Sequence, residues 1–222
     1  MDFAEPIKYP FKDLKKLLIG GLLNFPGMIL LLIPAIIATG YTIKAARDTV
    51  RGGDELPEFD NWSYFLIKGF GYFVINIAYM IILYATFIPA IALYFIGGSE
   101  NVVFMILSTI LGIAALIFAI ILCFMAYIAF VRYGEKENIG AAFEFVKIFR
   151  NFKANAVNYI IGMIVMIALL VGISIVTFIA TVTIVGILFM GVIAFYWQLV
   201  WMRMFAQIYK ESKEKLGEAE TL

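Results

Sequence analysis

The chain has 222 residues, of which 64% are hydrophobic and 15% charged, and its formal net charge is +1. A soluble globular domain averages about 45–50% apolar residues, so this composition is too apolar for a water-soluble core. Histidine is absent from the sequence, which removes the commonest general base and the commonest metal ligand. We expect no enzymatic activity, no cofactor, no metal and no nucleic-acid partner.

Four uncharged runs indicate membrane helices. They cover residues 17–43, 69–99, 101–131 and 154–202. A spanning helix needs roughly 20 apolar residues, and the backbone has to satisfy its own hydrogen bonds in hydrocarbon. We therefore predict an all-α, polytopic helical protein of the cell (cytoplasmic) membrane, folded as a single domain over residues 1–222.

The N-terminal part of the chain admits two paths through the membrane. "MDFAEPIKYP" carries acids and prolines in place of the basic segment of a signal peptide, so we expect the chain to be retained whole. Residues 11–18 form an amphipathic, interfacial segment. The stretch that follows fits either one span or a short hairpin. The turn signal "NFPG" at 24–27 favours the hairpin, whose first arm reaches only ~21 Å and is short enough to be re-entrant.

Residues 51–62, "RGGDELPEFDNW", form an acidic loop. We predict that Asp60 caps the next helix and that the other acids pair with Arg47, Arg51 or Lys68. The plainest interpretation is a structural turn. The alternatives are a docking surface for a protein partner and, least favoured, a Mg²⁺ or Ca²⁺ site, because the acids lack the regular spacing of a calcium loop. The candidate docking residues are Arg47, Arg51, Asp54, Glu55, Glu58, Asp60 and Trp62.

The rest of the chain is predicted to form two further hairpins. Segments 61–70 and 139–153 are amphipathic and each precedes a hairpin. The first of these hairpins turns at "GGSEN", 97–101. The last uncharged run would be ~73 Å long as one helix, so it must be two spans, and we place their turn between 181 and 186. The prediction is thus about six membrane segments in three hairpins, followed by a polar tail at 210–222.

Basic residues set the predicted orientation. All 17 Lys and Arg residues fall in four patches that flank the apolar runs. Cytoplasmic loops carry an excess of such residues, so every patch, both termini and the loop 51–62 are predicted to be cytoplasmic. "GGSEN" has no basic residue and is predicted to be external.

The last helix places aromatic residues around one cation. In "FYWQLVWMRMFAQIY", Arg203 either extends toward water from an aromatic belt, which is the favoured interpretation, or contacts a lipid headgroup together with Trp201. The few amides inside the runs are explained by hydrogen bonds between helices or, less favoured, by a substrate path. These amides are Asn76, Asn155, Asn158 and Gln198. Cys123 is predicted to be an apolar packing residue.

At the acidic loop the chain resembles a known family. The resemblance rests on "GGLL" at 20–23, "GY" at 40–41, Arg47, Gly52, "LPEFDNW" at 56–62 and Gly69. It is to an uncharacterised, mainly archaeal membrane family, domain of unknown function 4013. The resemblance implies a polytopic helical fold and supplies no activity, substrate or catalytic residue.

These observations favour a non-enzymatic protein that binds membrane lipids or a protein partner as a scaffold or assembly factor. The partner would dock at the cytoplasmic loop 51–62. The alternative is a small transporter or channel, which at this chain length would have to be a homo-oligomer.

Overall fold

The structure is a computed structural model that describes residues 1–29, 32–98, 101–182 and 184–217. Every regular element in those residues is a helix, which confirms the predicted all-α class. The helices are α1 (Glu5–Lys8), η1 (Tyr9–Lys12), α2 (Leu14–Ile29), α3 (Leu32–Val50), α4 (Trp62–Gly97), α5 (Val102–Lys136), η2 (Ile139–Phe143), α6 (Phe145–Ala154), α7 (Ala156–Thr181) and α8 (Ile184–Lys215).

Four of the described helices are long and apolar enough to cross a membrane. They are α4, α5, α7 and the Phe189–Lys215 part of α8. In the most apolar windows of α4, α5 and α7 only 6%, 11% and 6% of the residues are buried, whereas 56% are buried in α8. Helix α8 is therefore the central helix, and the other three present their apolar side chains to the surroundings.

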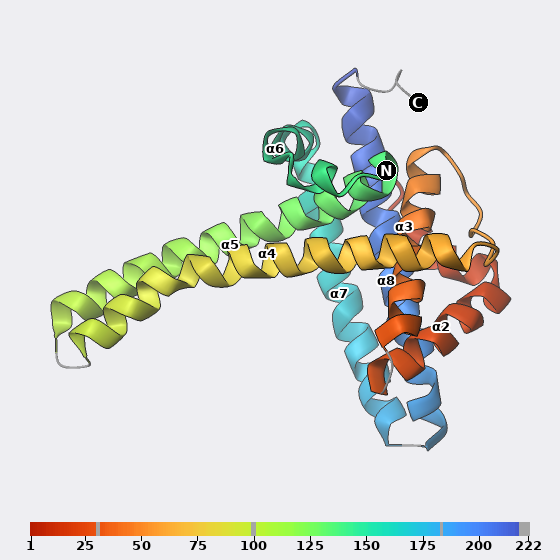
Figure 1. Cartoon of the computed structure of the whole chain (residues 1–222), viewed down its shortest axis with the longest axis horizontal. Helices are drawn as coiled ribbons and strands as arrows, with labels where there is room; N and C mark the ends of the chain where they lie inside the picture. The colour runs from red at the N-terminus through yellow and green to blue at the C-terminus, as the bar shows by residue number, and fades with distance from the viewer. Residues whose placement is uncertain (30–31, 99–100, 183, 218–222) are drawn as a thin grey trace.

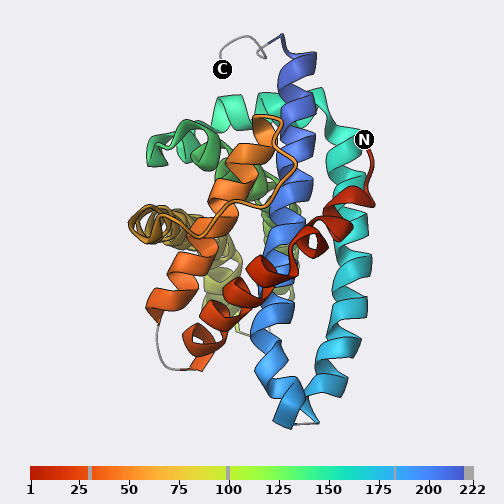
Figure 2. The same ribbon diagram turned by 90° about the vertical axis from the view of Figure 1, so that its right-hand side faces the viewer.

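The long helices form two antiparallel hairpins that point in different directions. The α4–α5 hairpin crosses α3 and α8 and extends to the left in Figure 1, whereas the α7–α8 hairpin extends downward. Helices α2 and α3 pack against α8, and the N-terminal segment crosses α8 (Figure 2). The polar ends of the helices meet where the two hairpins cross.

The core at this crossing is aromatic and closely packed. Tyr41 stacks on Phe59 with ring centroids 4.1 Å apart and lies 5.7 Å from Phe195. The α3 and α4 backbones touch at two glycines. A Cβ added to Gly40 would lie 1.8 Å from the carbonyl oxygen of Phe65, and one added to Gly69 would lie 1.8 Å from that of Ile36. No side chain fits at either position.

The predicted turn at 24–27 is wrong. Helix α2 continues through Pro26 to Ile29, and α3 begins at Leu32. In apolar surroundings, losing one proline N–H is less costly than exposing the polar backbone of an open turn, so the helix continues. Residues 30–31, which separate the two helices, lie outside the described residues.

The other predicted turns and amphipathic segments can be compared directly with the helix bounds. Helix α7 ends at Thr181 and α8 begins at Ile184, inside the predicted interval. In "GGSEN", residues 99–100 lie outside the described residues, as do 183 and 218–222. Segment 61–70 is the continuous start of α4, segment 139–153 becomes η2 and α6, and the predicted tail is helical as far as Lys215. Placement of these segments at a membrane interface stays a prediction.

Candidate functional site

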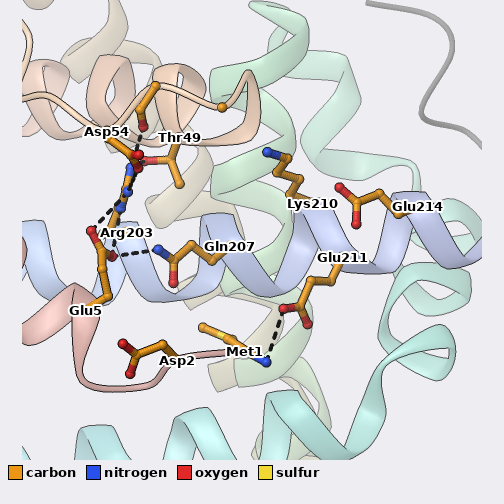
Figure 3. Close-up of a pocket in the computed structure, with 12 residues that line it drawn as sticks. Met1, Asp2, Glu5, Thr49, Asp54, Arg203, Gln207, Lys210, Glu211 and Glu214 are labelled. Carbon is orange, nitrogen blue, oxygen red and sulfur yellow. Dashed lines mark hydrogen bonds and ion pairs between the residues drawn. The ribbon is translucent and has the colours of Figure 1, made fainter.

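The polar end of the protein is organised around Arg203 of α8 (Figure 3). Its Nε donates to Glu5 (3.1 Å), and its Nη2 donates to Glu5 (3.0 Å) and Asp54 (2.6 Å). Its Nη1 donates to the Thr49 hydroxyl (2.9 Å) and the Gly53 carbonyl (2.6 Å). All five N–H groups of the guanidinium are thus engaged within the protein. We call these five residues the Arg203 cluster.

The backbone of the acidic loop is held by side chains rather than by secondary structure. Five consecutive carbonyls, those of residues 53–57, each accept a hydrogen bond from a side chain that is distant in sequence. Arg203 donates to Gly53 (2.6 Å), Lys12 to Asp54 (3.0 Å), Tyr9 to Glu55 (3.0 Å), Lys16 to Leu56 (2.8 Å) and Tyr41 to Pro57 (2.7 Å). Because a loop cannot satisfy its own backbone, these bonds fix its course. The N-terminal segment is docked on the loop.

The loop carboxylates pair with cations that the sequence analysis did not select as their partners. Asp54 pairs with Arg203 (2.6 Å), Glu58 with Lys16 (2.6 Å) and Asp60 with Lys44 (3.4 Å). The predicted pairing with Arg47, Arg51 or Lys68 is therefore wrong for Asp54 and Glu58. Asp60, which was predicted to cap a helix, pairs with Lys44. The basic partners come from α2, α3 and α8, which the fold brings to the loop.

The predicted cap at Asp60 is wrong by one residue. Helix α4 begins at Trp62, and the Asn61 side chain accepts a hydrogen bond from the Tyr64 N–H (3.0 Å). Asp60 is thereby left to pair with Lys44. Trp62 is 46% exposed, and its ring lies 5.7 Å from that of Phe59.

Arg47 belongs to a second cluster, centred on Glu137. The Glu137 carboxylate accepts hydrogen bonds from Arg47 (2.9 Å) and Tyr64 (2.8 Å) and lies 3.6 Å from the ammonium of Lys68. Glu137 ends α5 in the left-handed conformation, with φ 55°. This single residue joins α3, α4 and α5. Arg51, by contrast, is exposed at the end of α3.

The carboxylates of the Arg203 cluster have lowered pKa values. The hydrogen bond and charge of Arg203 lower the pKa of Asp54. Burial alone would raise the pKa of Glu5, but hydrogen bonds from Arg203, Lys12 and Gln207 outweigh it and lower the pKa. Both carboxyl groups are therefore anionic at neutral pH, and their negative charges complement the positive charge of the Arg203 guanidinium.

A cavity of about 390 Å³ opens beside the cluster. Its lining includes five carboxylates, whereas its cations are Arg203, Lys210 and the N-terminal amine, which lies 3.6 Å from Glu211. Figure 3 shows these side chains around it. A surplus of carboxylates repels an anionic headgroup. The predicted headgroup contact at Arg203 would also require one of its internal bonds to break, and Trp201 is only 7% exposed, within the aromatic core.

The membrane amides behave in two ways. Asn155, at the junction of α6 and α7, and Asn158 of α7 both donate to Glu211 of α8 (3.1 and 2.9 Å), as predicted for hydrogen bonds between helices. The Gln198 Oε1 atom is buried and has no hydrogen-bond partner among the described residues, and the same holds for Nδ2 of Asn24, an amide that the sequence analysis did not select. Within the same residues, no group of three or more Asp, Glu or Cys side chains is arranged to hold a metal ion.

Cys123 lines a small cavity of about 200 Å³ between α4 and α5, together with Asn76. The cavity lining is mainly aromatic and aliphatic. Nothing in it would activate a thiol, because a reactive cysteine needs a cation or a base nearby.

Comparison with known proteins places the chain in a family. The model of the family described as "Protein of unknown function (DUF4013)" matches residues 27–185. "Uncharacterized protein MJ1189" of Methanocaldococcus jannaschii is 31% identical over 146 residues, which are 63% of this chain and 48% of that protein. The aligned region thus spans about half the length of that relative. The search of solved structures found no significant match.

The family match runs from α2 to the start of α8 and includes the acidic loop with Asp54. Glu5 and Arg203 lie outside it. Because the match covers well over half of the chain, this protein belongs to the DUF4013 family.

Proposed function

We propose that the protein is a non-enzymatic scaffold of the cell membrane that holds a protein partner or lipid at its polar end. The observation that carries this proposal is the acidic edge of the loop, namely Asp54, Glu55, Glu58 and Asp60. The side chains of Asp54, Glu58 and Asp60 are 80%, 74% and 64% exposed. They stand on a backbone that five distant side chains fix in place.

This edge is suited to binding because its backbone is already ordered. A partner that docks on a flexible loop has to offset the entropy of ordering it, whereas docking here would leave the backbone unchanged. The charge of the edge indicates a partner with a basic surface, since opposite charges speed association and select the partner. Such binding would use side chains alone and would need no reactive group.

The proposed topology has six membrane segments in three hairpins, α2–α3, α4–α5 and α7–α8. With two crossings between successive basic patches, all the patches lie on the same side of the membrane. The excess of Lys and Arg identifies that side as the cytoplasm, and the acidic loop and both termini lie there too. Helices α2 and α3 have 16 and 19 residues, or about 24 and 28 Å. Their hairpin is therefore the one suited to a shallow or re-entrant path.

The test is native mass spectrometry of the protein extracted gently from its own membranes. The wild type should carry a protein subunit of defined mass. Glu55→Lys and Glu58→Lys should lose most of that mass while melting at the wild-type temperature. The matched control is Glu214→Lys, the same charge reversal at an exposed position of α8, and it should keep the subunit. Full retention by the loop variants would refute docking at the acidic edge.

The second candidate is a small oligomeric transporter or channel. It is favoured by Asn24 and Gln198, whose buried amide atoms lack partners among the described residues, since polar groups inside a membrane often mark a solute path. The path would have to form between copies, because α4, α5 and α7 are largely exposed along their apolar lengths. A bare symmetric oligomer by mass spectrometry, with solute flux in proteoliposomes that Asn24→Leu abolishes, would favour this function over the scaffold.

A further inference from the structure

A second cavity lies at the other side of the polar end, and its lining is basic. It measures about 880 Å³ and is formed by the end of α5, η2, α6 and the end of α8. Helix α6 lies beside the end of α5 in Figure 1. Among the described lining residues, five are cationic and one is a carboxylate, namely Arg132, Lys136, Lys147, Arg150 and Lys213 with Glu144.

Arg132 is a buried cation of this cavity, and only some of its N–H groups are hydrogen-bonded. It is 3% exposed. Its Nε donates to the Ala141 carbonyl (3.3 Å), its Nη1 to the Tyr209 hydroxyl (3.5 Å) and its Nη2 to Glu144. Of its five N–H groups, one on each terminal nitrogen has no acceptor within the described part of the chain. This differs from Arg203, whose N–H groups are all engaged.

The surrounding cations are held in place by carboxylates that they outnumber. Lys147 bonds to Glu144 (2.9 Å), and the buried Lys213 bonds to Glu135, which lies behind the lining. Lys136 lies 3.8 Å from Glu135 and is 45% exposed. Without Arg150 and with Glu135 included, the described residues here still have four cations against two carboxylates. A buried cationic site with unused guanidinium N–H groups suits an anion with several oxygens, and phosphate accepts such a fork of donors.

The position of the cavity indicates which kind of molecule would carry a bound phosphate group. Lys147 and Arg150 of α6 line the cavity, while Val146 and Phe149 of the same helix are 84% and 43% exposed. Helix α6 leads directly into the apolar α7. A short helix with cations on one side and exposed apolar side chains on another is typical of the level of lipid headgroups. The volume also exceeds what a free phosphate ion needs and lies in the range of small-molecule sites.

From these observations we propose that the cavity between α5, α6 and α8 binds the phosphate-bearing headgroup of an anionic membrane lipid. This proposal rests on the membrane placement and the lipid-binding part of the proposed function, and it is independent of a protein partner at the acidic edge. The two cavities of the polar end then have opposite roles. The acidic one beside Arg203 excludes phosphate, and the basic one beside Arg132 retains it.

The test is native mass spectrometry of detergent-purified protein mixed with phosphatidylglycerol, with phosphatidylcholine or with inorganic phosphate. The wild type should retain one phosphatidylglycerol in preference to phosphatidylcholine. The double variant Lys136→Gln/Lys147→Gln should weaken this binding by about twentyfold, since each cation removed from a headgroup site weakens binding several-fold. Both lysines are about half exposed, so the variant should melt as the wild type does.

The matched control is Lys8→Gln/Lys153→Gln, which removes the same charge from exposed positions outside the cavity. It should bind phosphatidylglycerol as the wild type does. An equal loss in the control, or equal retention of both lipids by the wild type, would overturn the proposal. Binding of inorganic phosphate without lipid retention would overturn the lipid source. A wild type that keeps its protein subunit but shows no preference for phosphatidylglycerol would refute this inference and leave the scaffold intact.

Discussion

Arg203 and Glu5 are 198 residues apart in sequence and form a two-point ion pair, with Nε to Oε2 at 3.1 Å and Nη2 to Oε1 at 3.0 Å. The pair fastens the N-terminal segment to the last helix. Because Arg203 also holds Asp54 and Gly53, the acidic loop, the N-terminus and α8 form one polar body. The shape of the exposed acidic edge thus depends on a residue that is almost wholly buried.

Replacing Arg203 by lysine should destabilise the protein although the charge is kept. Lysine has three N–H donors in place of five and no planar fork, so at least two acceptors of the cluster lose their bonds. A lost hydrogen bond to a charged, partly buried group costs about 1.5–3 kcal/mol. We expect Arg203→Lys to lower the free energy of unfolding by about 3 kcal/mol, measured by denaturant unfolding in detergent. Arg51→Lys, the same change at an exposed site, should have no measurable effect, and equal effects would contradict this account.

The cluster should weaken in acid. The pKa of Glu5 lies below its ordinary value of 4.5 in the folded protein, so the unfolded state binds the proton first. Stability from Glu5 is therefore complete above about pH 4.5 and is lost as the pH falls through the lowered folded-state value. At pH 7 we expect the wild type to have a higher melting temperature than Glu5→Gln. Below pH 4.5 we expect this difference in melting temperature to shrink. Glu58→Gln, whose carboxylate is 74% exposed, should match the wild type throughout. A difference between wild type and Glu5→Gln that is unchanged in acid would refute this prediction.

The helices could be predicted from the sequence, but their polar partners could not. An uninterrupted apolar run that is long enough to span a bilayer has to satisfy its own backbone hydrogen bonds and therefore forms a helix. The structure has helices in these runs. The partner of Asp54 is Arg203, 149 residues away, and no local pattern selects it over the nearer Arg51. Glu5 and Glu137 were missed for the same reason. Neither lies in the acidic loop, and the packing of the helices brings Arg203 to Glu5 and Arg47 and Lys68 to Glu137.

Local rules failed where two of them competed. "NFPG" is a turn signal in water, but α2 continues through it, because an apolar environment penalises an open backbone. Asp60 and Asn61 are both good capping residues, and the ion pair of Asp60 with Lys44 accompanies capping by Asn61. In both cases the surroundings, which the sequence does not display, decide between the two outcomes.

The contact between α3 and α4 should be intolerant of a methyl group. At Gly40 and Gly69 a Cβ would lie 1.8 Å from a carbonyl oxygen of the facing helix, so the two backbones would have to move apart. We expect Gly40→Ala and Gly69→Ala each to destabilise the protein by about 3 kcal/mol, the upper end for overpacking, in the same unfolding assay. Gly112→Ala and Gly172→Ala have nothing within 4 Å of the added Cβ and should be neutral or slightly stabilising. A neutral Gly69→Ala would show that the helices do not meet as described.

The proposed topology predicts which positions a membrane-impermeant thiol reagent reaches in intact cells. In a Cys123→Ala background, Glu55→Cys and Lys153→Cys should react only after the cells are opened, because the basic patches favour the cytoplasm. Val102→Cys, at the distant end of the α4–α5 hairpin, should react from outside. Leu32→Cys decides the first hairpin: reaction from outside indicates a spanning pair, and protection in both conditions indicates a re-entrant one. Labelling of Glu55→Cys in intact cells would place the acidic edge outside and refute its docking of a cytoplasmic partner.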